Sequence, residues 1–110
     1  MKLIARKKQL QTAPEIWLRS AGYAFIPEKD NDERSFARRL SRDFYPRFHI
    51  YFVEKKNTQG EEFIVFNLHL DQKRPGYAGQ KRHNAEYEGE VVESEARRLQ
   101  ALLLPEFMAQ

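Results

Sequence analysis

Residues 47–71 hold two runs of alternating apolar side chains, separated by a polar stretch that ends in a glycine. This pattern predicts a β-hairpin, because successive side chains of a strand point to opposite faces of a sheet. One face of the predicted hairpin is purely apolar and consists of Phe48, Ile50, Phe52, Ile64, Phe66, Leu68 and Leu70. The opposite face carries His49, His69 and Asp71. The apolar face therefore belongs to a buried core, and the polar face is the place to look for chemistry.

Helical and extended patterns flank this hairpin. A short helix that starts near Pro14 is followed by an extended segment at 23–26, and a second helix is predicted over about 33–43. A long loop at 72–89 leads to an amphipathic C-terminal helix over about 90–104. We therefore predict an α+β fold, in which a small antiparallel sheet is built on the central hairpin. Helices, including the C-terminal one, pack on one face of this sheet.

The length and composition place this fold in one domain. A chain of 110 residues has room for a single core, so we expect one α+β domain over 1–110. Residues 1–11 are basic and are expected to form a flexible arm, with a short edge strand at 2–5 as the alternative. The chain has no cysteine and no apolar run long enough to span a membrane. These features favour a cytoplasmic protein without a membrane partner.

Positive charge is concentrated in the first part of the chain. Residues 1–47 hold 11 Lys and Arg against 6 Asp and Glu, a net charge of +5, whereas residues 48–110 hold 8 against 10, a net charge of −2. On the predicted helix 33–43, Arg34, Arg38 and Arg42 recur every four residues and would form one stripe. A stripe of this kind either pairs with nearby acidic residues on a solvated helix face or binds an anionic partner.

The first hypothesis from these charges is a binding module for nucleic acid, or for an acidic protein partner, without a cofactor. Guanidinium groups suit phosphates, and aromatic faces suit bases. The residues expected to form this surface lie on the predicted arginine helix, at the start of the hairpin and in the long loop: Arg34, Arg38, Arg39, Arg42, Arg47, Lys73, Arg74, Tyr77, Lys81 and Arg82. A binding module of this kind would be a monomer or a homodimer and would need no catalytic residue.

The second hypothesis is a metal-dependent phosphoester hydrolase. Imidazoles and a carboxylate suit a divalent ion such as zinc or manganese. The candidate ligands are His49, His69, Asp71 and, from the long loop, His83. The hairpin loop must hold an odd number of residues, since an even number would bring the apolar face of one strand beside the polar face of the other. We expect His49 to pair with Asn67, which makes His69 its diagonal neighbour.

The third hypothesis is a protein–protein interaction or inhibitory protein that uses the outer sheet face. The contact patch would consist of Tyr51, Val53, Phe63 and Val65. No characterised family is identified from these motifs. The His-hydrophobic-His strand of the HUH endonucleases is the nearest comparison, but the corresponding strand here reads Asn67-Leu68-His69 and lacks the first histidine.

Overall fold

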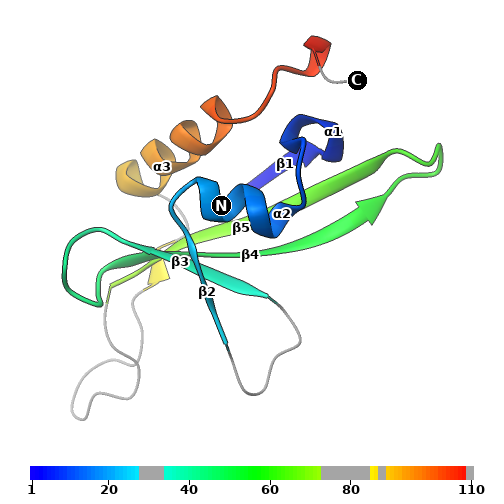
Figure 1. Cartoon of the computed structure of the whole chain (residues 1–110). Helices are drawn as coiled ribbons and strands as arrows, with labels where there is room; N and C mark the ends of the chain where they lie inside the picture. The colour runs from blue at the N-terminus through cyan, green and yellow to red at the C-terminus, as the bar shows by residue number, and fades with distance from the viewer. Residues whose placement is uncertain (28–33, 73–84, 87–88, 109–110) are drawn as a thin grey trace.

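The computed structural model describes residues 1–27, 34–72, 85–86 and 89–108. It confirms the α+β prediction: an antiparallel sheet is built on the central hairpin, with helices packed against it (Figure 1). The strand order is β1-β5-β4-β3-β2, and β6 pairs with β5 beside this path. The strands are β1 (Lys2–Arg6), β2 (Ala24–Ile26), β3 (Ser35–Arg39), β4 (Arg47–Lys56), β5 (Glu62–Asp71) and β6 (Ala85–Glu86). The helices are α1 (Lys7–Leu10), α2 (Pro14–Ser20), α3 (Glu90–Ala101) and the 3-10 turn η1 (Glu106–Met108).

The hairpin of β4 and β5 has the predicted faces but a different register. The loop has five residues, 57–61, so the predicted odd number is correct. Val53 pairs with Val65 and His49 pairs directly with His69, so the expected pairing of His49 with Asn67 is wrong by two residues. The loop begins at Asn57, whose side-chain oxygen accepts hydrogen bonds from the backbone N–H groups of Gln59 and Glu61. Alternation of apolar residues specifies only whether the loop length is odd or even, so the loop contacts of Asn57 are a candidate for what selects this register.

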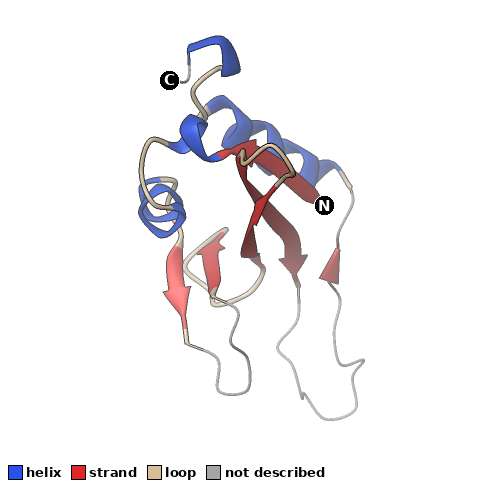
Figure 2. Cartoon of the chain, turned by 90° about the vertical axis from the view of Figure 1, so that its right-hand side faces the viewer, coloured by secondary structure: helices blue, strands red, loops and turns tan. Residues whose placement is uncertain are grey.

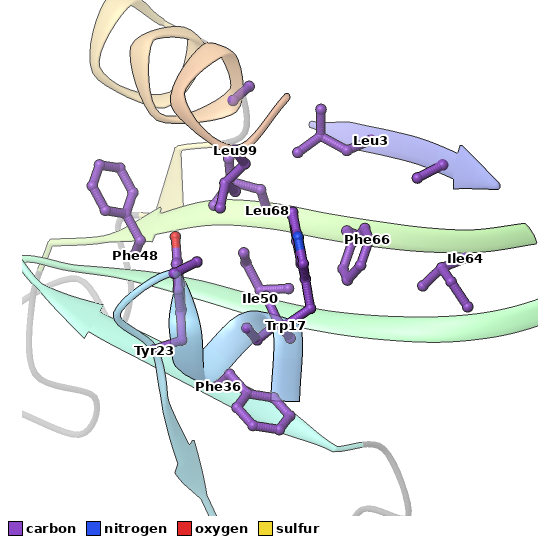
Figure 3. Close-up of a cluster of buried hydrophobic side chains, with 14 of the residues drawn as sticks. Leu3, Trp17, Tyr23, Phe36, Phe48, Ile50, Ile64, Phe66, Leu68 and Leu99 are labelled. Atoms are coloured by element: carbon purple, nitrogen blue, oxygen red, sulfur yellow. The ribbon is translucent and has the colours of Figure 1, made fainter. Parts of the chain in front are cut away.

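The core lies on the predicted face of the hairpin. The apolar residues of β4 and β5 that point to this face are buried beneath the helices, apart from the half-buried Phe52. Trp17 of α2 packs on Phe66, with 5.1 Å between the ring centroids, and Leu99 of α3 lies beside Leu68 (Figure 3). In the view of Figure 2 the helices lie together over the upper part of the sheet. The opposite face of the hairpin carries no helix in the described part of the chain.

The N- and C-terminal segments also join this core. Residues 2–6 form the edge strand β1, which pairs with β5, so the alternative of an edge strand replaces the expected flexible arm. The C-terminal helix is present but ends at Ala101, three residues earlier than predicted. It buries Val92 rather than Val91, because its buried face also includes Glu95, Ala96 and Leu99.

The predicted helix over 33–43 is wrong. Residues 35–39 form β3, which lies between β4 and β2 in the sheet. Phe36 is 1% exposed and pairs with Ile50, and burial of this ring within the sheet outweighs the helical spacing of the arginines. The stripe of Arg34, Arg38 and Arg42 therefore does not exist.

No helix in the described residues is long and apolar enough to cross a membrane. This agrees with the absence of a long apolar run in the sequence.

Candidate metal centre

The register of the hairpin brings His49, His69 and Asp71 together on its outer face. His49 of β4 lies directly opposite His69 of β5, and Asp71 follows two residues after His69 on the same face. The rings of the two histidines have centroids 4.5 Å apart at an angle of 71°. We call these three residues the triad. Three of the four ligands expected from the sequence thus meet, whereas His83 lies outside the described residues.

The donor atoms of the triad converge. His49 Nδ1 lies 2.8 Å from His69 Nε2, and His69 Nε2 lies 3.1 Å from Asp71 Oδ1. His49 Nδ1 lies 3.6 Å from Asp71 Oδ2. Each residue offers one ligand atom within 4.8 Å of the other two. Donor atoms held at about 2.0–2.2 Å by a tetrahedral zinc ion lie roughly 3.4 Å apart, so these spacings fit a shared ion.

Proton sharing alone accounts for these contacts less well than a cation does. His69 Nε2 carries at most one proton, so it can donate to His49 Nδ1 or to the Asp71 carboxylate but not fully to both. A divalent cation attracts the lone pairs of both nitrogens and of the carboxylate at the same time. The donor set of two imidazoles and one carboxylate therefore fits a metal of the zinc or manganese type.

The triad is shielded but not sealed. The side chain of His69 is 9% exposed, that of His49 is 15% exposed and that of Asp71 is 20% exposed. A structural zinc site has four protein ligands, whereas a catalytic site has three and keeps one position open. Within the described residues the triad supplies three, and none of the three side chains is completely buried.

The carboxyl group of Asp71 is ionised at neutral pH. Burial raises its pKa, but the hydrogen bond with His69 and the electrostatic interactions around the carboxyl group lower the pKa by more. The electrostatic part of this lowering comes from interactions of Asp71 with the two histidines and with Arg47, whose Nε lies 3.6 Å from Asp71 Oδ2. The net result is a pKa below the ordinary value of 3.8. An ionised carboxylate is the form that binds a metal.

A group of arginines and aromatic rings lies next to the triad. Arg47 pairs with Asp71 on one side and with Arg39 of β3 on the other. The guanidinium carbon of Arg47 lies 4.8 Å from the ring centroids of both Phe44 and Tyr45. That of Arg39 lies 5.0 Å from the centroid of Phe44. We call Arg39, Phe44, Tyr45 and Arg47 the arginine–aromatic cluster.

The other arginines expected to bind nucleic acid have different places. Arg34 forms an ion pair with Glu15. Arg38 points to the helix-covered face of the sheet, where its Nη1 lies 3.4 Å from Glu95 Oε1. Arg42 is exposed between β3 and β4, and its carbonyl oxygen accepts a hydrogen bond from Arg39 Nη1 at 3.4 Å. The structure therefore brings together Arg39 and Arg47 but not Arg34 or Arg38.

The residues of the long loop that were predicted to bind nucleic acid lie outside the described residues. These are Lys73, Arg74, Tyr77, Lys81 and Arg82. The backbone on either side of them is placed, because Asp71 pairs with Ala85.

A buried polar network was missed by the sequence reasoning. Glu95 of α3 accepts a hydrogen bond of 2.6 Å from the Tyr23 hydroxyl and bonds of 2.8 and 2.9 Å from Arg98. Glu95 is 4% exposed and Tyr23 is 3% exposed. The position of Glu95 beside Ala96 on the apolar face of the helix was the available signal, since a buried carboxylate needs partners.

The outer face beyond the triad is open. Tyr51, Val53, Phe63 and Val65 are half-buried there, and Ile4 of β1 is 66% exposed beside Val65. The described helices cover the other face, so these residues are available for contact.

Comparisons of the chain with protein-family models, with curated proteins and with solved structures gave no match. The interpretation of the triad therefore depends on its own geometry.

Proposed function

We propose that the triad holds a divalent metal ion and that the protein hydrolyses a phosphoester. The observation that carries this proposal is the convergence of one donor atom each from His49, His69 and Asp71 within 4.8 Å. A metal ion in such a site would lower the pKa of a bound water, to about 7 in the case of zinc, and would polarise a phosphoryl oxygen. The hydrolase was the second hypothesis from the sequence, and it gains most from the observed hairpin register.

The residues of the chain have distinct roles in this proposal. The two imidazoles and the Asp71 carboxylate are the metal ligands, held by the paired backbones of β4 and β5. Arg47 lies beside Asp71 and is positioned to neutralise charge on a phosphoryl group. In the reaction the oxygen of water bonds to phosphorus while the bond from phosphorus to the ester oxygen breaks. Water gives up one proton, and the departing oxygen gains one.

Metal analysis tests the binding step. Protein purified without a His tag is dialysed and titrated with zinc and manganese. We expect one ion per chain in the wild type. Asp71→Asn keeps the size of the side chain but removes its charge, and we expect the affinity for the ion to fall by about 100-fold or more, beyond what the loss of a supporting residue causes. Glu54→Gln is the matched control, because Glu54 is exposed on β4 away from the triad.

Hydrolysis of bis(p-nitrophenyl) phosphate tests the chemical step. We expect turnover that depends on added metal and is lost in Asp71→Asn and His69→Gln. Because His69 is buried, the melting temperature of each variant is measured as well, and a folded but inactive Asp71→Asn protein supports the proposal. Metal bound below one-tenth of an equivalent would contradict it. So would a bound iron that drives oxygen consumption, since two histidines and a carboxylate also suit iron oxygenases.

A further inference from the structure

Two guanidinium groups lie in one row with Asp71 of the triad. The register across β3, β4 and β5 places Arg39 opposite Arg47, and Arg47 opposite Asp71. The next row on the same face consists of Ala37, His49 and His69. The cationic side chains are therefore fixed beside the triad by backbone pairing at the end of the sheet, and not by loop geometry alone.

Aromatic rings lie against these cations. Phe44 remains 46% exposed although the guanidinium groups of both Arg39 and Arg47 lie within 5.0 Å of its centroid. The Phe44 and Tyr45 rings meet edge to face, with 5.1 Å between their centroids. An exposed ring supported by guanidinium groups presents a flat surface on which another ring can stack.

The charge of the cluster is only partly neutralised within the described residues. Arg47, whose side chain is 12% exposed, shares one carboxylate, Asp71, with the triad. No carboxylate of the described residues lies within 4.0 Å of the Arg39 guanidinium, and Arg39 is exposed. The cluster therefore offers positive charge, chiefly that of Arg39, to an anion that approaches from solvent.

We propose that the substrate of the triad is single-stranded nucleic acid, held by the arginine–aromatic cluster. This inference rests on the proposed phosphoester hydrolysis. Arg39 and Arg47 bind the phosphodiester group next to the triad, and a base stacks on the Phe44 ring or on the guanidinium group that lies over it. The open outer face of the hairpin lets an extended strand approach.

The cluster favours a single strand over the other anions. In a duplex the faces of the bases are stacked on one another, so an exposed protein ring cannot reach them without unstacking. An acidic peptide would use Arg39 and Arg47 but would leave the Phe44 ring without a flat partner. A small phosphate ester would use the arginines alone. The ring beside the guanidinium groups therefore indicates the base.

The experiment compares two probes of the same length. Fluorescence anisotropy measures binding of a ten-nucleotide oligo(dT) and of a ten-unit abasic oligodeoxynucleotide, in EDTA so that neither is cleaved. We expect the wild-type chain to bind oligo(dT) about tenfold more tightly, because each stacked base contributes. Phe44→Leu removes this difference between the probes. Phe107→Leu is the matched control, since Phe107 is 85% exposed in η1, and it leaves the difference unchanged.

The arginines are tested by salt dependence. Arg39→Gln weakens binding of both probes alike and reduces the slope of log K against log salt by about 0.7, as expected for one lost phosphate contact to a single strand. Arg19→Gln, at an exposed position of α2, leaves both affinities unchanged.

The outcomes separate this inference from the proposed function. If Phe44→Leu behaves as Phe107→Leu does, or if polyglutamate of equal charge binds as tightly as oligo(dT), the inference is overturned while metal binding by the triad stands. If the chain binds oligo(dT) through Phe44 but takes up no zinc or manganese, the hydrolase proposal fails and this surface is a binding site only. Metal-dependent cleavage of oligo(dT), lost in Asp71→Asn, supports both.

Discussion

At the scale of single residues, Glu95 connects three parts of the fold. Its carboxylate accepts a hydrogen bond from the Tyr23 hydroxyl and forms ion pairs with Arg98 of its own helix and with Arg38 of β3. Glu95→Gln would leave the half-buried side chain of Arg98 without its ionic partner. We expect a loss of about 3 kcal/mol in the free energy of unfolding, measured by urea denaturation, because breaking a buried pair costs roughly 3–5 kcal/mol and the Arg98 side chain is 35% exposed.

The matched control is Glu93→Gln, on the exposed side of the same helix. It should change the free energy of unfolding by less than about 0.5 kcal/mol. Equal losses of unfolding free energy in the two variants would show that the buried network of Glu95 adds no more stability than an exposed glutamate does.

Because the pKa of Glu95 is lowered in the folded chain, we expect the free energy of unfolding to depend on pH. Burial raises the pKa of Glu95, but hydrogen bonds from Arg98 and Tyr23 and the charges of Arg98 and Arg38 together bring it below the ordinary 4.5. A carboxyl group with a lower pKa in the folded chain binds its proton more tightly when unfolded. Its stabilisation is therefore complete above about pH 4.5 and is lost as the pH falls through the lower folded value.

The measurement is the difference in unfolding free energy between the wild type and Glu95→Gln across pH 2–7. Other carboxyl groups, including Asp71, cancel in this difference. We expect the difference to be constant above about pH 5 and to shrink below it. A difference that grows on acidification has the wrong sign and would contradict the assignment.

At the scale of elements, the five-residue loop between β4 and β5 decides how the triad forms. Asn57 Oδ1 accepts hydrogen bonds from two backbone N–H groups of the loop. Gly60 has a φ of 84°, a backbone conformation that favours glycine. Asn57→Ala removes both hydrogen bonds. We expect a loss of about 1–2 kcal/mol in urea denaturation, whereas Thr58→Ala in the same exposed loop should be nearly neutral.

A metal readout gives this prediction a second test. If the loop holds the register, Asn57→Ala also weakens zinc binding, although Asn57 lies far along the hairpin from the triad. Unchanged stability in Asn57→Ala would mean that cross-strand pairs alone fix the register.

The same scale shows what the sequence could predict. The hairpin, its two faces and the shared outer face of His49, His69 and Asp71 follow from the alternation in 47–71, because one apolar face must be buried. The direct pairing of His49 with His69 does not follow from it. The two-residue error in register arose because alternation specifies only odd or even. The strand at β3 was missed because its arginines have helical spacing, and the partners of Arg38 lie far away along the chain. Only pairing with β4 shows that Arg38 and Arg39 point to opposite faces.

At the scale of the whole molecule, metal binding should stabilise the complete fold. The triad joins β4 to β5 at the centre of the sheet, so an ion bound there favours the folded chain over the unfolded one. At a free metal concentration 100 times the Kd, the stabilisation is about 2.7 kcal/mol. We expect the melting temperature to rise by at least about 10 °C on addition of zinc and to fall back with EDTA.

Asp71→Asn is the control for this stabilisation. Its melting temperature should not respond to zinc at the same concentration. An equal rise in wild type and variant would assign the effect to binding elsewhere on the chain.

The strand order has a consequence for association between copies of the protein. The two long strands β4 and β5 are internal, and the sheet ends in the three-residue β2 on one side and the short β1 and β6 on the other. Beyond Tyr51, β4 has no strand partner on its β3 side among the described residues, and this edge carries Phe52 and Val53 followed by the charged Glu54, Lys55 and Lys56. Short or charged edges oppose the edge-to-edge pairing that starts aggregation. The most apolar segment of the chain is thus protected, and a variant that detaches β1 would uncover the matching edge of β5 and promote fibril formation.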